Sequence, residues 1–547
     1  MAIKIPEMTD EVKRTIEQKR QEQALATQQP TTMAEVSAAL KAWGHNWREE
    51  HKETKKKNGS TIEVIHRVPP RAIANKIKEL VQIAVIGDTR KELEKAPLVH
   101  YDCDTGIYVD GTRQLERLIL AADNTTKSRE RLEIMGWLRV EAPQKRIEQN
   151  QALVPVGNGV VNLVTGQLMP FSPDLVFTNK ISTNYNADAT EPTFNGWRFS
   201  AWVDELAAGD PDKATLIWQL IASTVRNRWT SNVMFALIDN GQGRTGKSTM
   251  EQLLINLVGQ ENMASLKLDQ FEQQFLLAKA FGARLIIGDD NNPKGYIDDG
   301  STLKSIVTNE MVLVNPKGMA PFTARFFATI VQSMNGMPRF RDTSGGLYRR
   351  FRIINFPKQY ADTPANRKIK DEYIKNPQLL EWILKQALQV SIDTIVDTRE
   401  SQEIVHETRL DNDPVLYFVE NHFDAAEIES TRLPASFLFH WFLSAMNHEN
   451  AKSAMKQNTF TKQVTPLLEE RGWHKTRQKP LDRFKEADVK LIDDLDPLTG
   501  EAHSYVTKSI KLDQKITLFE NIIWVLPLSA TAFATLLDID ISTLNKN

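Results

Sequence analysis

The sequence predicts an α/β protein whose largest part is built on a parallel β-sheet. Three short apolar runs, residues 233–238, 283–288 and 326–331, carry this prediction, and each of them ends in polar residues. Apolar runs of this length with polar boundaries are typical of strands that are buried on both faces of a parallel sheet. An amphipathic helix is predicted after the first run, because Met250, Leu253 and Leu257 recur at helical spacing.

A glycine-rich loop separates the first run from that helix. Residues 241–248 read GQGRTGKS, which fits G-x-x-x-x-G-K-[ST]. The glycines let backbone N–H groups converge on phosphates, while Lys247 would reach the β- and γ-phosphates and the Ser248 hydroxyl would ligate Mg²⁺. The loop therefore predicts a site for ATP and Mg²⁺. Its predicted nucleotide-binding residues are Gly241, Gly243, Arg244, Thr245, Gly246, Lys247, Ser248 and Thr249.

The second and third runs end in residues suited to ATP hydrolysis. Asp289 and Asp290 follow residues 283–288, in the Walker B pattern of a strand ending in two carboxylates. We assign Asp289 to Mg²⁺ and Asp290 to the general base that polarises the attacking water. Asn335 follows the third run, where its amide would hydrogen-bond the γ-phosphate or the water. The alternative for these residues is an Asp-rich turn and a turn-forming Asn.

Two further segments supply basic groups. Arg349 and Arg350 precede an apolar strand predicted at 353–356, and they suit an arginine finger donated to a neighbouring subunit's ATP. The alternative is a surface arginine pair. Residues 311–324 are predicted to form a hairpin with Lys317 at its tip, which in a ring-shaped motor would face a central channel and grip DNA phosphates.

Composition limits the function classes. At 547 residues the chain is long enough for three or four domains, and its formal net charge of -2 argues against a uniformly basic nucleic-acid coat. The single cysteine, Cys103, excludes an internal disulfide and suits a reducing cytosol. No run approaches the length of a membrane span, and no secretory signal is apparent. We expect a cytoplasmic protein without a membrane partner.

The N-terminal residues offer an alternative chemistry. Residues 1–32 are predicted to be a tail, 52–60 a basic loop, and 71–95 helical. Asp102 and Asp104 stand at alternate positions of a predicted strand, which places two carboxylates on one side of it. Such a pair can hold catalytic metals, as in primases of the archaeo-eukaryotic type. The simpler interpretation is a strand running into an Asp-Thr-Gly turn.

The C-terminal third is predicted to contain a winged helix. Two helices are expected, at 434–446 and 458–471, and a basic strand or wing follows them. In that arrangement the second helix enters a major groove. The predicted DNA-binding residues, with the hairpin lysine, are Lys317, Lys462, Lys475 and Arg477. A protein-docking or ring-bracing module is the alternative.

The order of these motifs resembles the superfamily III helicases of viruses and phages, and more narrowly the poxvirus-type and phage or plasmid "primase" C-terminal ATPases. Asn335 to Pro338, then residues 342–344, then Arg349 and Arg350 match that family's N-x-x-P…D-x-S…R-R signature. The turn-rich stretch around residues 157–194 is similar to the module that precedes the motor in the same family. The resemblance covers roughly residues 95–420.

The resemblance implies a hexameric, AAA+-like ring that unwinds DNA 3′→5′ by translocating on one strand. In similar phage and mobile-island initiators the C-terminal module recognises the replication origin. Related proteins often carry a full primase domain in front, and none is evident here, so primase activity is not carried over. The domains expected from the sequence are 1–95, a tail and small helical region; 96–194, a mixed strand-rich module; 195–397, the AAA+-like motor; 398–430, a linker; and 431–547, the winged helix with a C-terminal extension.

The first hypothesis is therefore a helicase that initiates replication of a phage, plasmid or mobile element in a bacterial host cytoplasm. Its expected partners are single-stranded and forked DNA, an origin duplex, five further copies of the chain, and host replication proteins. A bifunctional primase-helicase is the second hypothesis. The third is a DNA-binding regulator whose ATPase switches assembly without unwinding.

Overall fold

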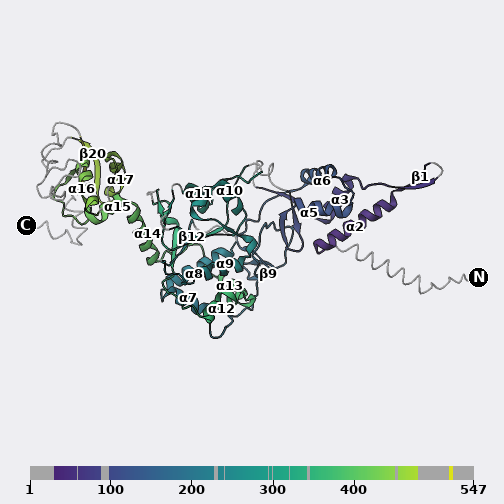
Figure 1. Ribbon diagram of the computed structural model, residues 1–547, viewed down its shortest axis with the longest axis horizontal. Coiled ribbons are helices and arrows are strands. Elements are labelled where there is room, and N and C mark those ends of the chain that lie inside the picture. The colour runs from purple at the N-terminus through teal and green to yellow at the C-terminus, as the bar shows by residue number, and fades with distance from the viewer. Residues whose placement is uncertain are drawn as a thin grey trace, which may run out of the picture. The chain divides into compact units, whose positions relative to one another are not determined.

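The computed structural model describes residues 30–57, 60–87, 98–226, 232–239, 241–292, 295–297, 300–318, 321–341, 345–449, 454–478 and 516–521 (Figure 1). The chain divides into two compact units, Met1–Ile404 and Val405–Asn547. Residues 342–344, which belong to the signature above, lie outside the described residues, as do the predicted tail up to residue 29 and most of residues 481–547.

The first unit contains the predicted parallel sheet. Its five strands lie in the order β11-β12-β16-β10-β18, and each pairs in parallel with its neighbours. They are β10 (Met234–Ile238), β11 (Met263–Ser265), β12 (Leu285–Asn291), β16 (Thr329–Met334) and β18 (Phe351–Asn355). The strand before the glycine loop is thus flanked by the strands that precede Asn335 and follow Arg350. The parallel-sheet prediction is confirmed.

The start of the third strand differs from the sequence prediction. We expected it at residue 326, but β16 begins at Thr329, where pairing with β12 starts. The carbonyl of Phe326 instead accepts a hydrogen bond of 2.8 Å from the Asn309 side chain. A side-chain donor from another loop therefore replaces a strand partner at this position.

Helices cover the parallel sheet and bury its apolar side chains. α7, α8, α9 and α13 share one core with β10, β12 and β18, in which Phe235, Leu254 and Ile383 are fully buried. The helices of this motor are α7 (Phe199–Ala207), α8 (Pro211–Val225), α9 (Lys247–Val258), α10 (Gln274–Leu277), α11 (Ser301–Val307), α12 (Pro364–Asp371) and α13 (Pro377–Ala387). Its short strands are β13 (Tyr296–Ile297), β14 (Val312–Val314), β15 (Phe322–Ala324) and β17 (Arg339–Phe340).

The N-terminal part of the first unit has its own core. A four-stranded sheet, ordered β5-β4-β3-β6, packs with helices α2, α3, α5 and α6. The elements are α2 (Met33–Glu50), α3 (Pro70–Leu80), β3 (Ile83–Ile86), β4 (Leu98–Asp102), β5 (Ile107–Asp110), α5 (Thr112–Ala122), α6 (Ser128–Glu141) and β6 (Gln144–Lys145). The boundary expected at residue 95 runs through this core, because α2 and α3 pack with α5 and α6.

Two local predictions in this region were wrong. The stretch 71–95 is not helical throughout, since α3 ends at Leu80 and β3 follows with its apolar side chains against β4. The basic segment 52–60 is not a loop. It forms β1 (Lys52–Lys57), which pairs antiparallel with β2 (Ser60–Ile65), because backbone pairing with the apolar, β-branched second strand outweighs the low strand propensity of lysine.

A third small sheet joins this region to the motor. β7 (Leu153–Val156), β8 (Gly159–Asn162) and β9 (Gln167–Met169) form an antiparallel meander, as the turn signals predicted. The chain after it bonds to the end of α9: Ser182 N donates to Val258 O at 3.0 Å, and the Thr183 hydroxyl donates to Leu257 O at 2.8 Å. The helix that follows the glycine loop is therefore held at its C-terminal end.

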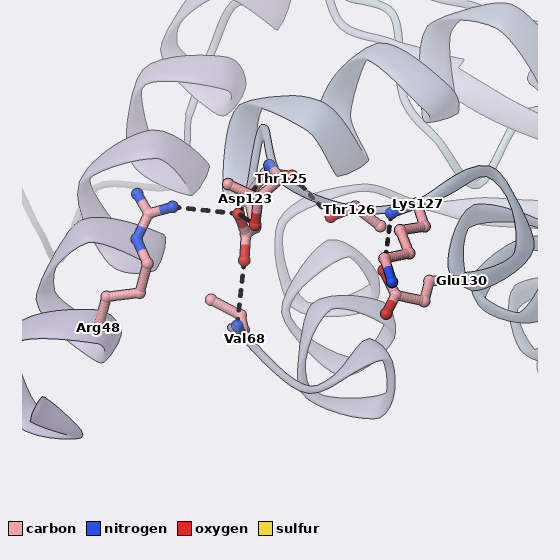
Figure 2. A network of polar contacts seen from close by, with 7 residues as sticks. All are labelled: Arg48, Val68, Asp123, Thr125, Thr126, Lys127 and Glu130. Atoms are coloured by element: carbon pink, nitrogen blue, oxygen red, sulfur yellow. Dashed lines mark hydrogen bonds and ion pairs between the residues drawn. The ribbon is translucent and has the colours of Figure 1, made fainter. Parts of the chain in front are cut away.

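A buried carboxylate ties the N-terminal helices together. Asp123, 1% exposed, accepts hydrogen bonds from Val68 N, Thr125 N and the Thr125 hydroxyl at 3.1, 2.9 and 2.7 Å (Figure 2). Arg48, on α2, forms an ion pair with it at 3.1 Å. Burial alone would raise the pKa of Asp123, but the donors and the Arg48 charge outweigh it, so the pKa lies below its ordinary value.

Replacing Asp123 with alanine is expected to destabilise the N-terminal helices by about 3 kcal/mol, because it leaves Arg48 and a buried N–H without their acceptor. Since its pKa is lowered in the folded protein, Asp123 contributes stability above the unfolded pKa of about 4, and this stability is lost as the pH falls through the folded pKa. Hydrogen exchange of α2 and α5 amides measures both effects. Exposed Asn124→Ala is the matched control, and equal protection in the two variants would contradict the prediction.

In the described part of the second unit, helices α15, α16 and α17 pack on an antiparallel sheet of order β19-β21-β20. Its elements are α15 (Pro414–Phe418), a π-helical turn (Val419–Phe423), β19 (Arg432–Pro434), α16 (Ala435–His448), α17 (Gln457–Glu469), β20 (Trp473–Gln478) and β21 (Ile516–Asn521). The two predicted helices and the basic strand are confirmed.

The first part of the segment 398–430, which was expected to be a linker, forms a helix, α14 (Arg399–Asn412). Its polar composition concealed the helix. The side chains that it buries are small, as in Ser401, whose hydroxyl accepts a hydrogen bond of 2.9 Å from Ile353 N. Among the described residues, no helix combines the length and the apolar character needed to cross a membrane.

Candidate nucleotide-binding and hydrolysis site

The glycine loop curls over the carboxyl end of β10 and leads into α9. Gly241, Gly243 and Gly246 have φ of 79°, 66° and 100°, values that residues with side chains rarely adopt, and Arg244 has φ of 51°. A Cβ at Gly241 or Gly243 would meet nothing within 4 Å, so the concave side of the loop is open. The loop borders a pocket of about 210 Å³.

The predicted residues gather in that pocket. Its lining comprises Asp239, Gly243, Arg244, Thr245, Gly246, Lys247, Ser248, Asp289, Asp290, Ser333, Met334 and Asn335. Thus the ends of β10, β12 and β16 bring together the loop, the acidic pair and Asn335. Of the predicted nucleotide-binding residues, Gly241 and Thr249 are not part of this lining.

Lys247 is held by three oxygen acceptors. Its Nζ lies 2.8 Å from Asp239 Oδ1 and donates to Met334 O at 2.8 Å and to Asn335 Oδ1 at 3.1 Å. Asp239 also accepts from Gly241 N and from the Thr245 hydroxyl, both at 3.1 Å. Burial of Asp239 would raise its pKa, but Lys247 and these donors lower it, so this carboxylate stays charged. The sequence analysis did not assign a role to Asp239.

A β-bulge aims the acidic pair. The register of β12 against β16 shifts between Gly288 and Asn291, and Asp290 adopts φ of 52°, the left-handed conformation. Asn291 holds the bulge: its Nδ2 donates to Gly288 O at 2.8 Å and to Ser333 O at 3.1 Å, and its Oδ1 accepts from Leu268 N at 2.9 Å. Asp289 and Asp290 are consequently both exposed toward the pocket.

Behind the pocket lies a buried acid that the sequence analysis missed. Glu251, 5% exposed, is one turn after Lys247 on α9, and its Oε1 has no hydrogen-bond partner. Burial, followed by the charge of Asp289, raises the pKa of Glu251 to about 7, although the charges of Lys247 and Lys370 oppose the rise. At helical spacing Glu251 looked like an ordinary polar helix residue, and only the tertiary structure brings it near Asp289.

The donor set fits ATP and Mg²⁺. The loop offers N–H groups at positive φ, Lys247 offers a cation, and the Ser248 hydroxyl and Asp289 carboxylate are the hard oxygen ligands that Mg²⁺ prefers. When bound, Mg²⁺ neutralises charge on the β- and γ-phosphates. For Lys247 to reach the phosphates, its ammonium must leave the ion pair with Asp239 and contact the phosphate oxygens instead.

The two candidate finger arginines differ in their surroundings. Arg349 is exposed, whereas Arg350 is 9% exposed and its Nη1 donates to Gly346 O. Burial, and then the neighbouring charge of Arg349, lower the pKa of Arg350. Neither residue lines the pocket of its own chain.

The predicted hairpin is present: β14 and β15 pair antiparallel from Val312↔Ala324 to Val314↔Phe322. Lys317 is exposed in its turn. The hairpin rests on the motor through Phe322, whose ring lies 5.2 Å from that of Phe281, and through Asn315, which donates to the Gln274 side chain at 3.2 Å.

The carboxylate pair Asp102 and Asp104 does not share a strand face. β4 ends at Asp102, and Asp104 lies in the following turn. Asp102 Oδ1 accepts from Asp104 N at 2.9 Å, and Asp104 Oδ1 accepts from Met33 N, at the start of α2, at 3.2 Å. Both carboxylates therefore act as turn and helix caps, and within the described residues no group of three potential metal-ligating side chains includes them.

In the second unit, the predicted DNA-binding residues lie on adjacent elements. α17 buries Phe460, Val464 and Leu468 and leaves Lys462 exposed. Lys475 and Arg477 are exposed on β20.

Three family models match the chain in succession. The "D5 N terminal like" model matches residues 36–205, a family of unknown function matches 240–350, and the "Poxvirus D5 protein-like" model matches 410–497. In the sequence, the two D5 matches therefore lie before and after the residues that line the nucleotide pocket. The chain therefore contains two regions similar to D5-like proteins. These matches and the pocket's lining residues together indicate a D5-like ATPase.

Solved structures resemble this D5-like protein only distantly. The C-terminal region of NrS-1 is 12% identical, with 76% of this chain and 98% of that chain covered and a TM-score of 0.42. A JCV helicase with a bound small organic molecule is 17% identical, with 46% of this chain and 64% of that chain covered and a TM-score of 0.23. TM-scores this low leave these similarities without weight for function.

Proposed function

We propose that this D5-like protein is a replication-initiating DNA helicase of a phage, plasmid or mobile element, which works as a hexameric, AAA+-like ring and translocates 3′→5′ on single-stranded DNA. The observation that carries the proposal is that the residues suited to ATP hydrolysis do not all lie in one pocket. Lys247, Ser248, Asp289 and Asn335 line one pocket, whereas the conspicuous arginine pair lies outside it.

A neighbouring subunit supplies the missing cation in this proposal. Hydrolysis needs positive charge at the γ-phosphate besides the loop lysine. Arg349 is exposed and belongs to the N-x-x-P…D-x-S…R-R signature, so it suits donation across a subunit boundary. Arg350, buried against Gly346 O, would position it. ATP at a seam between subunits then couples hydrolysis to movement of one subunit against the next.

The hairpin of residues 312–324 is the proposed DNA grip. Its lysine is exposed, while Phe322 and Asn315 anchor the turn end of the hairpin to Phe281 and Gln274, so movement of the motor core would be transmitted to the lysine. An ammonium at that position can bind successive phosphates without reading sequence.

Replacing Lys317 with alanine is expected to leave basal ATP turnover unchanged and to slow unwinding of forked DNA by at least roughly tenfold, because one phosphate contact per subunit is lost. The measurement is strand displacement alongside phosphate release. Lys317→Arg keeps the charge and should retain most unwinding.

This pair of assays also tests the proposed function. Wild-type protein that hydrolyses ATP and binds DNA but displaces no strand would favour the regulator, whose ATPase only switches assembly. Unwinding by Lys317→Ala at the wild-type rate would leave the helicase in place but remove the hairpin as its grip.

The second unit is proposed to be a winged-helix domain that binds the origin. Its elements follow one another as helix, strand, helix, helix and two strands, with β21 between β19 and β20. This order of the described elements supports the proposal, in which the exposed face of α17 with Lys462 would enter the major groove. Lys475 and Arg477 on β20 would contact phosphates beside it.

Lys462→Ala is expected to weaken binding to a preferred duplex by about 1–3 kcal/mol, since it removes a contact from the reading helix. Selection of duplexes from a random library by the wild-type protein identifies that sequence, and competition binding then compares the variant. Lys475→Ala should weaken all duplexes about equally. If both variants keep the sequence preference of the wild-type protein, the assignment of α17 as the reading helix is contradicted.

A further inference from the structure

The segment between β18 and α12 lies against the glycine loop. The Gln359 side chain donates to Gln242 O at 2.9 Å, and Tyr360 N donates to Arg244 O at 2.9 Å. A Cβ on Gly246 would lie 3.7 Å from the Tyr360 ring. The segment, which precedes α12, therefore contacts the backbone of the glycine loop. In the sheet its strand, β18, lies on the other side of β10 from β12, the strand that ends in the acidic pair.

α12 carries a second lysine to the pocket. Lys370, at its C-terminal end, donates to the Ser248 hydroxyl at 3.0 Å. No residue of α12 is fully buried. Thr363 caps its start through Asn366 N, and the partly buried Ile369 packs against the motor core, so polar and apolar contacts together hold the helix. Figure 1 shows α12 next to α9, the helix that begins with the glycine-loop lysine.

The two lysines have different partners. Lys247 is neutralised by Asp239, with which it forms a 2.8 Å ion pair. Lys370 donates to a neutral hydroxyl, the same oxygen that the glycine loop presents to Mg²⁺. An ammonium and a divalent cation repel each other at that distance, whereas a phosphate oxygen within reach of a flexible lysine attracts it.

We propose that Lys370 contacts the terminal phosphate of bound ATP from the same subunit, and so makes α12 and the segment that precedes it sensitive to the presence of the γ-phosphate. The Ser248 hydroxyl holds the ammonium beside the phosphate position when no nucleotide is bound. ATP offers Lys370 an anionic partner that ADP lacks, so the position of α12 differs between the two states. This inference rests on the ATPase assignment and is independent of unwinding.

The test is equilibrium binding of full-length protein to fluorescent ATPγS and fluorescent ADP, each with Mg²⁺. Lys370→Ala is expected to weaken ATPγS binding about tenfold and ADP binding less than about twofold, because one charge-assisted phosphate contact is lost. Lys370→Arg should restore the preference for ATPγS. Lys368→Ala, on the same helix and exposed, is the matched control and should bind as wild type.

Other outcomes overturn the proposal. Equal weakening of both nucleotides would assign Lys370 a structural role in the loop, and unchanged binding would make it a solvated lysine. Stronger ATPγS binding by Lys370→Ala would show that the ammonium only obstructs Mg²⁺. Wild-type protein that binds neither nucleotide would instead remove the ATPase assignment itself.

Discussion

Replacing Lys247 with alanine is expected to lower ATP turnover by roughly 10³-fold, because the lysine is the loop's own cation for the β- and γ-phosphates. This ammonium contacts Asp239, Met334 O and Asn335, all of which line the pocket. Its removal leaves the Asp239 carboxylate near the phosphates without a counter-ion, which adds repulsion to the lost contact. Steady-state phosphate release measures the effect.

Two controls sharpen this prediction. Lys368→Ala removes an exposed lysine from α12 and should hydrolyse ATP at the wild-type rate. Asp239→Asn combined with Lys247→Ala removes both members of the ion pair and should bind ATP better than Lys247→Ala alone. Turnover by Lys247→Ala within a few fold of wild type would remove the glycine loop from catalysis.

Arg349→Ala is the second large effect, with turnover expected to fall by roughly 10³-fold, the range of an arginine finger. Because the finger is proposed to serve the neighbouring subunit, two inactive variants should complement each other. In an equimolar mixture of Arg349→Ala and Lys247→Ala subunits, roughly one interface in four joins an intact Lys247 to an intact Arg349. Turnover should therefore recover to about a quarter of the wild-type rate.

Variants of the adjacent Arg350 distinguish a positioning role from a direct role in hydrolysis. Arg350 is buried and bonded to Gly346 O, so Arg350→Lys should lower turnover by disturbing the turn and should show reduced thermal stability, which Arg349→Ala should not. Mixtures that stay inactive at every ratio would refute donation between subunits. If the protein stays monomeric in the presence of ATP and DNA, the proposed ring is refuted as well.

The sequence by itself determined the parts of the site that are contiguous in the chain. The glycine loop, the strand ending in Asp289 and Asp290, and the strand ending before Asn335 are each specified within a dozen residues, and parallel pairing places their ends together. The hairpin was predictable for the same reason, since its turn and both of its strands are local.

The tertiary structure decided what depends on distant partners. The sequence left Asp104 as a metal ligand or a turn residue, and its hydrogen bond from Met33 N makes it a cap. The residues from 399 were expected to be a linker, and their helix depends on distant contacts such as that of Ser401 with β18. Glu251, Asn291 and Lys370 carry no motif, because a carboxyl, an amide or an ammonium acquires its role from the groups around it. Those groups come from chain segments up to 122 residues away, as in the contact between Lys370 and Ser248.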